Sequence, residues 1–90
     1  ITRQEAAVMV TGAAKLCGMD NQLSSAAIRD ILAQFSDYVD AADWAQGSLA
    51  FCYQQNILDQ SDLEIMPMEA IKRGEIAQML FNMLTQAKLL

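Results

Sequence analysis

The 90-residue sequence contains no histidine, which removes the usual side chain for metal binding and for acid–base catalysis near neutral pH. It has only two cysteines, Cys17 and Cys52, which are too few and too far apart for a zinc site or a dense disulfide framework. Both fall on apolar helical positions, so we expect two buried thiols, with a single disulfide as the alternative. Neither a metal nor another cofactor is expected.

Positive charge is also scarce, since six Lys and Arg stand against eleven Asp and Glu, for a net charge of −5. Nucleic-acid binding depends on clustered Lys and Arg that neutralise phosphates, so no nucleic-acid partner is expected. No apolar run reaches the roughly 20 residues of a membrane span, which argues against membrane insertion. Nothing in the sequence supplies an oriented base beside a nucleophile, so we do not expect an enzyme.

Apolar residues, in contrast, make up 53% of this short chain. A domain of such length buries only about 60% of the surface that its unfolded chain exposes. More apolar surface is therefore present than a compact monomer easily hides. We expect self-association or packing against neighbouring units of a longer protein.

The most informative stretch is I-T-R-Q-E-A-A at residues 1–7, which returns at residues 71–77 as I-K-R-G-E-I-A. Each copy opens an apolar helical run. In the first copy Thr2 and Glu5 have the spacing of a capping box, in which each side chain accepts from the other residue's backbone N–H. In the second copy Lys72 has no side-chain oxygen with which to cap the helix.

The arginines Arg3 and Arg73 do not fit this local chemistry, because a cation in the first helical turn is unfavourable by some tenths of a kcal/mol. A helix N-terminus beside a guanidinium can hold a carboxylate or phosphate through charge-assisted hydrogen bonds. The alternative is that both arginines pair with carboxylates of the protein itself.

Apolar spacing of three and four residues predicts an all-α fold with four helices. Gly18 and Asn56 are the expected stops of the first and third helices, because both residues tolerate the left-handed conformation after a helix end. Asp40 or Asp43 is the expected N-cap of the third helix. The helices are expected at residues 2–17, 24–35, 43–56 and 71–84, with a loop at 59–70.

The two motif copies align at an offset of seventy residues, which indicates an internal repeat. The chain would then hold one complete unit and the closing helix of the unit before it. The matched pairs are Arg3 with Arg73, Glu5 with Glu75, Ala7 with Ala77 and Met9 with Met79.

Further residues along the chain form an ordered set, which comprises Phe35-Ser36-Asp37, Trp44-Ala45, Asn56-Ile57, Pro67, and Ile71, Arg73, Glu75, Ala77, Met79 and Leu80. This set resembles the S-layer homology domain, whose motif at the start of the closing helix reads I-T-R-A-E. By this resemblance, residues 1–18 are the closing helix of a preceding repeat, and residues 19–90 are one repeat with an extended linker at 19–34.

The resemblance implies helical-hairpin repeats that assemble into a pseudo-symmetric, three-pronged helical bundle. It also implies a non-catalytic, extracellular module that anchors a protein to the cell wall or cell surface. The ligand in that family is an anionic secondary cell-wall polysaccharide, often bearing pyruvate ketals.

Carried over position by position, the resemblance places the ligand-binding arginine of the family at Arg3 and Arg73. Gln4, next to Arg3 in the motif, joins the candidate ligand residues, and Lys72 would add a second cation or remain solvated. Trp44 would stack on a sugar, with burial in the core as the alternative. Asp37 is expected to cap the turn before the third helix, with a ligand role as the alternative.

The chain departs from the family pattern at several positions. Lys72 and Gly74 replace a threonine and an alanine of the motif, and Asn56 and Gln60 replace the usual glycines of the turn that ends the helix. These changes weaken the case for the second site. The alternative function is a structural helical module that mediates oligomerisation or assembly without binding carbohydrate.

Overall fold

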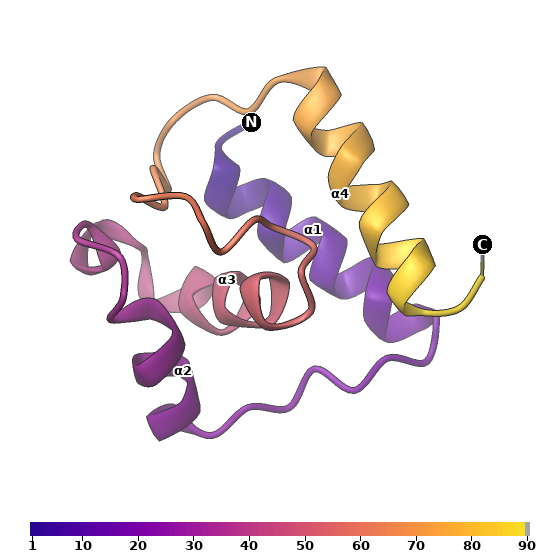
Figure 1. The fold of residues 1–90 in the computed structure, drawn as a ribbon, viewed down its shortest axis with the longest axis horizontal. Helices are drawn as coiled ribbons and strands as arrows, with labels where there is room; N and C mark the ends of the chain where they lie inside the picture. Colours follow the sequence, from indigo (N-terminus) through magenta and orange to yellow (C-terminus); the bar gives the residue numbers. More distant parts are fainter. Residues whose placement is uncertain (90) are drawn as a thin grey trace.

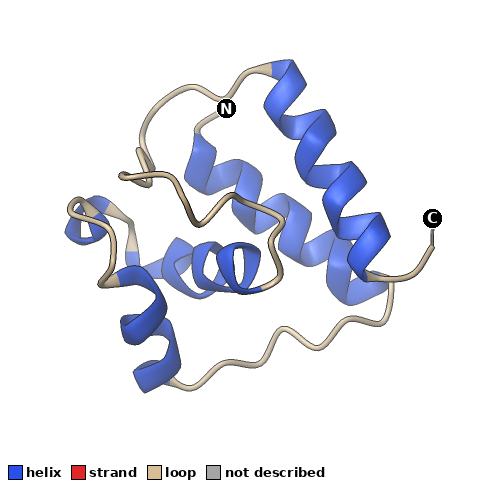
Figure 2. Ribbon diagram, in the orientation of Figure 1, coloured by secondary structure: helices blue, strands red, loops and turns tan. Residues whose placement is uncertain are grey.

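A computed structural model describes residues 1–89, so residue 90, the last of the predicted repeat unit, lies outside the described residues. Apart from one isolated β-bridge, the regular structure within residues 1–89 is helical, which confirms the predicted all-α class with four α-helices (Figure 2). The elements are α1 (Arg3–Leu16), α2 (Ser25–Leu32), the short 3-10 helix η1 (Tyr38–Asp40), α3 (Asp43–Gln54) and α4 (Arg73–Gln86).

Helix α1 is central, because α3 packs on one side of it and α4 on the other, while α2 packs on α3 (Figure 1). The N-terminus lies near the start of α4, and the long loop after α3 crosses the front of the molecule to reach that helix (Figure 1). Both motif copies open a 14-residue helix at their arginine, seventy positions apart.

The core forms where α3 meets α1. On α1, Ala6, Ala7 and Ala14 are at most 1% exposed, and their small side chains let the neighbouring helices approach closely. The ring of Tyr53 on α3 packs against Phe35, with 4.4 Å between ring centroids. The buried residues of α3 are Ala45, Leu49, Ala50, Phe51, Cys52 and Tyr53.

The predicted capping box at the start of α1 is confirmed. The Thr2 hydroxyl accepts from the Glu5 N–H at 3.2 Å, and the Glu5 carboxylate accepts from the Thr2 N–H at 2.8 Å. Hydrogen bonds from the Thr2 backbone and hydroxyl also hold the pKa of Glu5 below its ordinary value. At α4 the N-cap residue is Lys72, which makes no capping hydrogen bond through its side chain within residues 1–89.

Both predicted helix ends are confirmed as well. Gly18 follows α1 with φ of 87° and Asn56 follows α3 with φ of 58°, so each takes the left-handed conformation. The chain then turns back, and the Ile57 and Leu58 N–H groups both donate to the Cys52 carbonyl. Both side chains are buried as a result.

The predicted N-cap of α3 is wrong. The N-cap is Ala42, and Asp43 is the first helical residue, where its charge suits the positive end of the helix dipole. The Ala42 N–H donates instead to the side-chain carbonyl oxygen of Gln4 at 2.9 Å. The start of α3 is therefore held by a side chain from α1.

We expect Thr2→Ala to lower the free energy of unfolding by about 1 kcal/mol, because it removes a capping acceptor and frees the Glu5 carboxylate. Urea denaturation followed by circular dichroism would measure the change. Lys72→Ala is the matched control at the other motif copy, where no side-chain cap exists to be lost. Equal effects of the two substitutions would contradict the capping role of Thr2.

Candidate functional site

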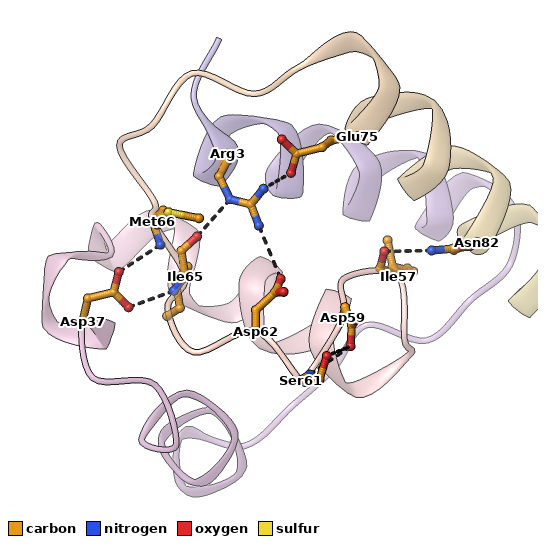
Figure 3. Close-up of polar contacts among 10 residues, drawn as sticks. All are labelled: Arg3, Asp37, Ile57, Asp59, Ser61, Asp62, Ile65, Met66, Glu75 and Asn82. Atoms are coloured by element: carbon orange, nitrogen blue, oxygen red, sulfur yellow. Dashed lines mark hydrogen bonds and ion pairs between the residues drawn. The ribbon is translucent and has the colours of Figure 1, made fainter.

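Arg3, the first candidate ligand residue, is only 5% exposed and inserts beneath the loop that precedes α4 (Figure 3). Its Nε donates to the Ile65 carbonyl at 3.0 Å. One terminal nitrogen pairs with the Glu75 carboxylate on α4, and the other lies 4.0 Å from the Asp62 carboxylate. The alternative in which Arg3 pairs with carboxylates of the protein itself is thus realised in the structure.

Gln4, the second candidate, is 3% exposed and is also bonded inside the chain. Its side-chain amide donates to the Met68 sulfur at 3.0 Å, while its carbonyl oxygen holds the start of α3. A role of Arg3 and Gln4 in ligand binding stays a prediction. In this structure both residues join α1 to the loop.

Backbone hydrogen bonds also join the start of α1 to the loop that precedes α4; this contact region is called here the junction. Thr2 and Ala70 form an antiparallel bridge, and the Arg3 N–H donates to the Glu69 carbonyl at 2.8 Å. The Gln4 N–H donates to the Pro67 carbonyl at 3.0 Å. The first residues of the chain thus run beside residues 67–71 and fix the direction in which α4 begins.

Asp37 has a role that the sequence did not reveal. Its carboxylate accepts the Ile65 N–H at 2.8 Å and the Met66 N–H at 2.9 Å (Figure 3). It precedes η1 but makes no capping hydrogen bond there within residues 1–89, so the predicted turn cap is wrong. Met66 has φ of 51°, and Asp37 stabilises this left-handed turn beside the Arg3 contact.

We expect Arg3→Ala to lower the free energy of unfolding by about 2 to 3 kcal/mol, because it leaves the Ile65 carbonyl without its donor and Glu75 without its cation. Arg73→Ala is the matched control, since Arg73 is exposed, and it should change stability by less than about 0.5 kcal/mol. Urea unfolding of both variants gives the comparison. A stability of Arg3→Ala equal to that of the unmodified chain would refute the structural role of this contact.

Two buried side chains of α3, the thiol of Cys52 and the phenol of Tyr53, can lose a proton at high pH. Burial raises the pKa of the Cys52 thiol from 9.0 to about 11, although a hydrogen bond from Thr11 opposes the shift. Burial also raises the pKa of Tyr53 from 10.0 to about 12, partly offset by the nearby Arg3 cation. The Tyr53 hydroxyl has no hydrogen-bond partner among residues 1–89. Cys17 is half-buried, and the two cysteines form no disulfide in the described chain.

These raised pKa values predict a loss of stability at alkaline pH. The folded chain holds both protons more tightly than the unfolded chain does, so the stabilisation is complete below pH 9.0 and falls as pH rises toward 11 for Cys52 and 12 for Tyr53. One such proton contributes a slope of about 1.4 kcal/mol per pH unit. Urea unfolding between pH 8 and pH 11 should therefore show a steeper loss of stability for the unmodified chain than for Cys52→Ala, and equal slopes would contradict the prediction.

Lys72 and Arg73, the candidates of the second motif copy, are both exposed at the start of α4. Lys72 occupies the N-cap in an extended conformation, and Arg73 is the first helical residue. Glu75 sits at the capping-box position but pairs with Arg3. The N-terminus of α4 therefore presents two cations and helix N–H groups without a capping side chain from this chain's described residues.

Trp44, the remaining candidate, is 62% exposed in the first turn of α3, so the alternative that it is a core residue is wrong. An exposed indole offers a flat apolar face for stacking. Helix α3 packs on α1 and α2, whereas Lys72 and Arg73 belong to α4 on the other side of α1 (Figure 1). The structure does not bring Trp44 and the two cations together.

A groove of about 650 Å³ lies along the loop before α4. Its lining includes four carboxylates, which makes it unsuited to an anionic ligand. The residues that line it are Asp37, Asp40, Glu64, Met66, Pro67, Met68, Glu69 and Ala70.

Within the described chain no cluster of three or more His, Cys, Asp or Glu is arranged to hold a metal ion. Among residues 1–89, none of the helices has the length and apolar composition that a membrane-spanning segment requires.

Sequence reasoning missed the acceptors of Arg3, although one signal was present. In the first motif copy Glu5 is bound to Thr2, but in the second copy Lys72 replaces the threonine, which leaves Glu75 free to pair elsewhere.

No family model, curated protein or solved structure matches the chain.

Proposed function

We propose that the chain is a non-catalytic anchoring module of the S-layer homology type, located at the cell wall or cell surface, that binds an anionic secondary cell-wall polysaccharide. The ordered motifs of the sequence support this proposal. So do the two equal helices that start at Arg3 and Arg73, as expected for closing helices of successive helical-hairpin repeats. Such repeats would form a pseudo-symmetric, three-pronged bundle when further units are present.

The observation that carries the proposal is the contrast between the two helix starts. At α1 the N-terminus is closed, because Thr2 and Glu5 cap it and Arg3 is buried under protein carboxylates. At α4 the N-terminus is uncapped by side chains of the described residues, and Lys72 and Arg73 are exposed. The second motif copy is therefore the open anion site, although its sequence departs further from the family pattern.

The chemistry of this open site fits an acidic sugar substituent. A guanidinium can bind a carboxylate through two parallel hydrogen bonds, and the N–H groups of the first helical turn add partial positive charge. Lys72 supplies a second cation that needs no fixed geometry. Pyruvate ketal, uronate and phosphate groups all carry the negative charge that such a site selects.

Trp44 would contribute separately, by stacking on a sugar ring from its exposed position on α3. A polymer differs from a small ligand in that it can contact sites on different helices at once, which raises its avidity. The placement of Trp44 away from Lys72 and Arg73 is therefore compatible with an extended chain of sugars.

Binding to purified cell-wall polysaccharide tests the proposal. We expect Lys72→Ala combined with Arg73→Ala to weaken binding at least tenfold in a pull-down or calorimetric titration, and we expect binding to fall as salt rises. Lys15→Ala combined with Lys88→Ala removes the same charge from exposed positions elsewhere and should bind nearly as the unmodified chain does. Equal losses in the two double variants would mean that only net charge matters, and the assigned site would fail.

A further inference from the structure

Met68 has an exposed side chain, yet its sulfur takes part in a contact with a buried residue. Met68 is 65% exposed and lines the groove along the loop before α4. Its sulfur accepts a hydrogen bond from the side-chain nitrogen of Gln4 at 3.0 Å, and Gln4 is only 3% exposed. Among residues 1–89, Met68 is the one methionine whose sulfur accepts a hydrogen bond. A thioether that is open to solvent is also the kind that oxidants attack.

The other end of the Gln4 amide reaches a different element. Its carbonyl oxygen accepts the N–H of Ala42, the N-cap residue of α3, at 2.9 Å. The backbone N–H of Gln4 donates to the carbonyl of Pro67, directly before Met68. Because an amide group is planar and rigid, its nitrogen cannot shift without moving its oxygen as well. A change at the Met68 sulfur is thus transmitted to the start of α3.

We propose that Met68 is a site of oxidation by hydrogen peroxide, and that its sulfoxide loosens the contact through which Gln4 joins the loop to α3. In the reaction one peroxide oxygen forms a bond to the sulfur while the O–O bond breaks. The sulfur is oxidised by two electrons and the peroxide is reduced. The proton of the transferred oxygen passes to the leaving oxygen, which departs as water. The product is methionine sulfoxide, a polar and chiral side chain.

The surroundings of Met68 favour an uncharged oxidant. Four carboxylates line the same groove, and they repel anionic oxidants such as hypochlorite. Hydrogen peroxide carries no charge near neutral pH, and it is small compared with the groove volume of about 650 Å³. It therefore reaches the sulfur without an electrostatic barrier.

The geometry leaves no room for a sulfoxide beside the present contact. An oxygen added on the side that faces Gln4 would have to fit between two atoms 3.0 Å apart, so either Gln4 or the loop must move away. An oxygen added on the other side withdraws electron density from the sulfur, which then accepts the hydrogen bond more weakly. Since Gln4 is buried, little water reaches its amide to replace the weakened partner, and the loss destabilises the folded chain.

Peroxide treatment of the 90-residue chain tests the proposal. We expect peptide mass spectrometry to find the sulfoxide at Met68 before it appears at Met79 and Met83, which are each 2% exposed. The Tm of the oxidised chain, measured by circular dichroism, should fall by at least about 4 °C. The same treatment should lower the Tm of Met68→Leu by less than half as much, because leucine has no sulfur. The amide hydrogen of Ala42 should exchange at least about tenfold faster after oxidation of the unmodified chain.

Met9→Leu is the matched control, because Met9 is 64% exposed on α1 and its sulfur accepts no hydrogen bond within residues 1–89. Oxidation should lower the Tm of this variant as much as that of the unmodified chain. Three results would each overturn the proposal: a Met68 that stays unoxidised while Met9 is oxidised, an equal fall of Tm in Met68→Leu and the unmodified chain, and unchanged exchange at Ala42. The inference does not rest on polysaccharide binding, since every readout is a property of the chain alone.

Discussion

The arrangement of the chain depends on the contacts that the buried guanidinium of Arg3 makes with its acceptors. It joins α1 to the loop through the Ile65 carbonyl and to α4 through the Glu75 carboxylate. A buried cation is costly unless its donors are matched with acceptors, so the loop and α4 must both be in place around it. Asp37 completes the junction from the other side of the loop, by holding the backbone N–H groups of Ile65 and Met66.

Features that depend on a few neighbouring residues could be predicted from the sequence. The Thr2–Glu5 box and the left-handed ends at Gly18 and Asn56 are of this kind. The α3 cap could not be predicted in the same way, because the Ala42 N–H is taken by Gln4, a residue 38 positions earlier. No local pattern contains such a partner.

The candidate site shows the same division. The sequence singled out Arg3 and Arg73 as residues that helix chemistry alone does not explain, and the structure separates them into one enclosed and one exposed guanidinium. The difference follows from where the acceptors lie: the acceptors of Arg3 come 59 to 72 positions later, between Asp62 and Glu75. Periodicity locates a helix start, but it does not show which distant carboxylate will reach it. The sequence left Trp44 open between stacking on a ligand and burial in the core for a similar reason, since its exposure depends on how α1 and α2 pack on α3.

The pairing of the first residues with residues 67–71 has a consequence for the order in which the chain folds. During synthesis α1 emerges long before Glu69, Ile71 and Glu75. The bonds that the start of α1 makes to these three residues can therefore form only after residues 69–75 have been made. Contacts between such distant positions slow folding, because the entropy of closing the long loop is lost before the contacts form. Helices α2 and α3, which are close in sequence and pack on one another, are therefore expected to associate first, and the junction at Arg3 should be the last part of the molecule to become native.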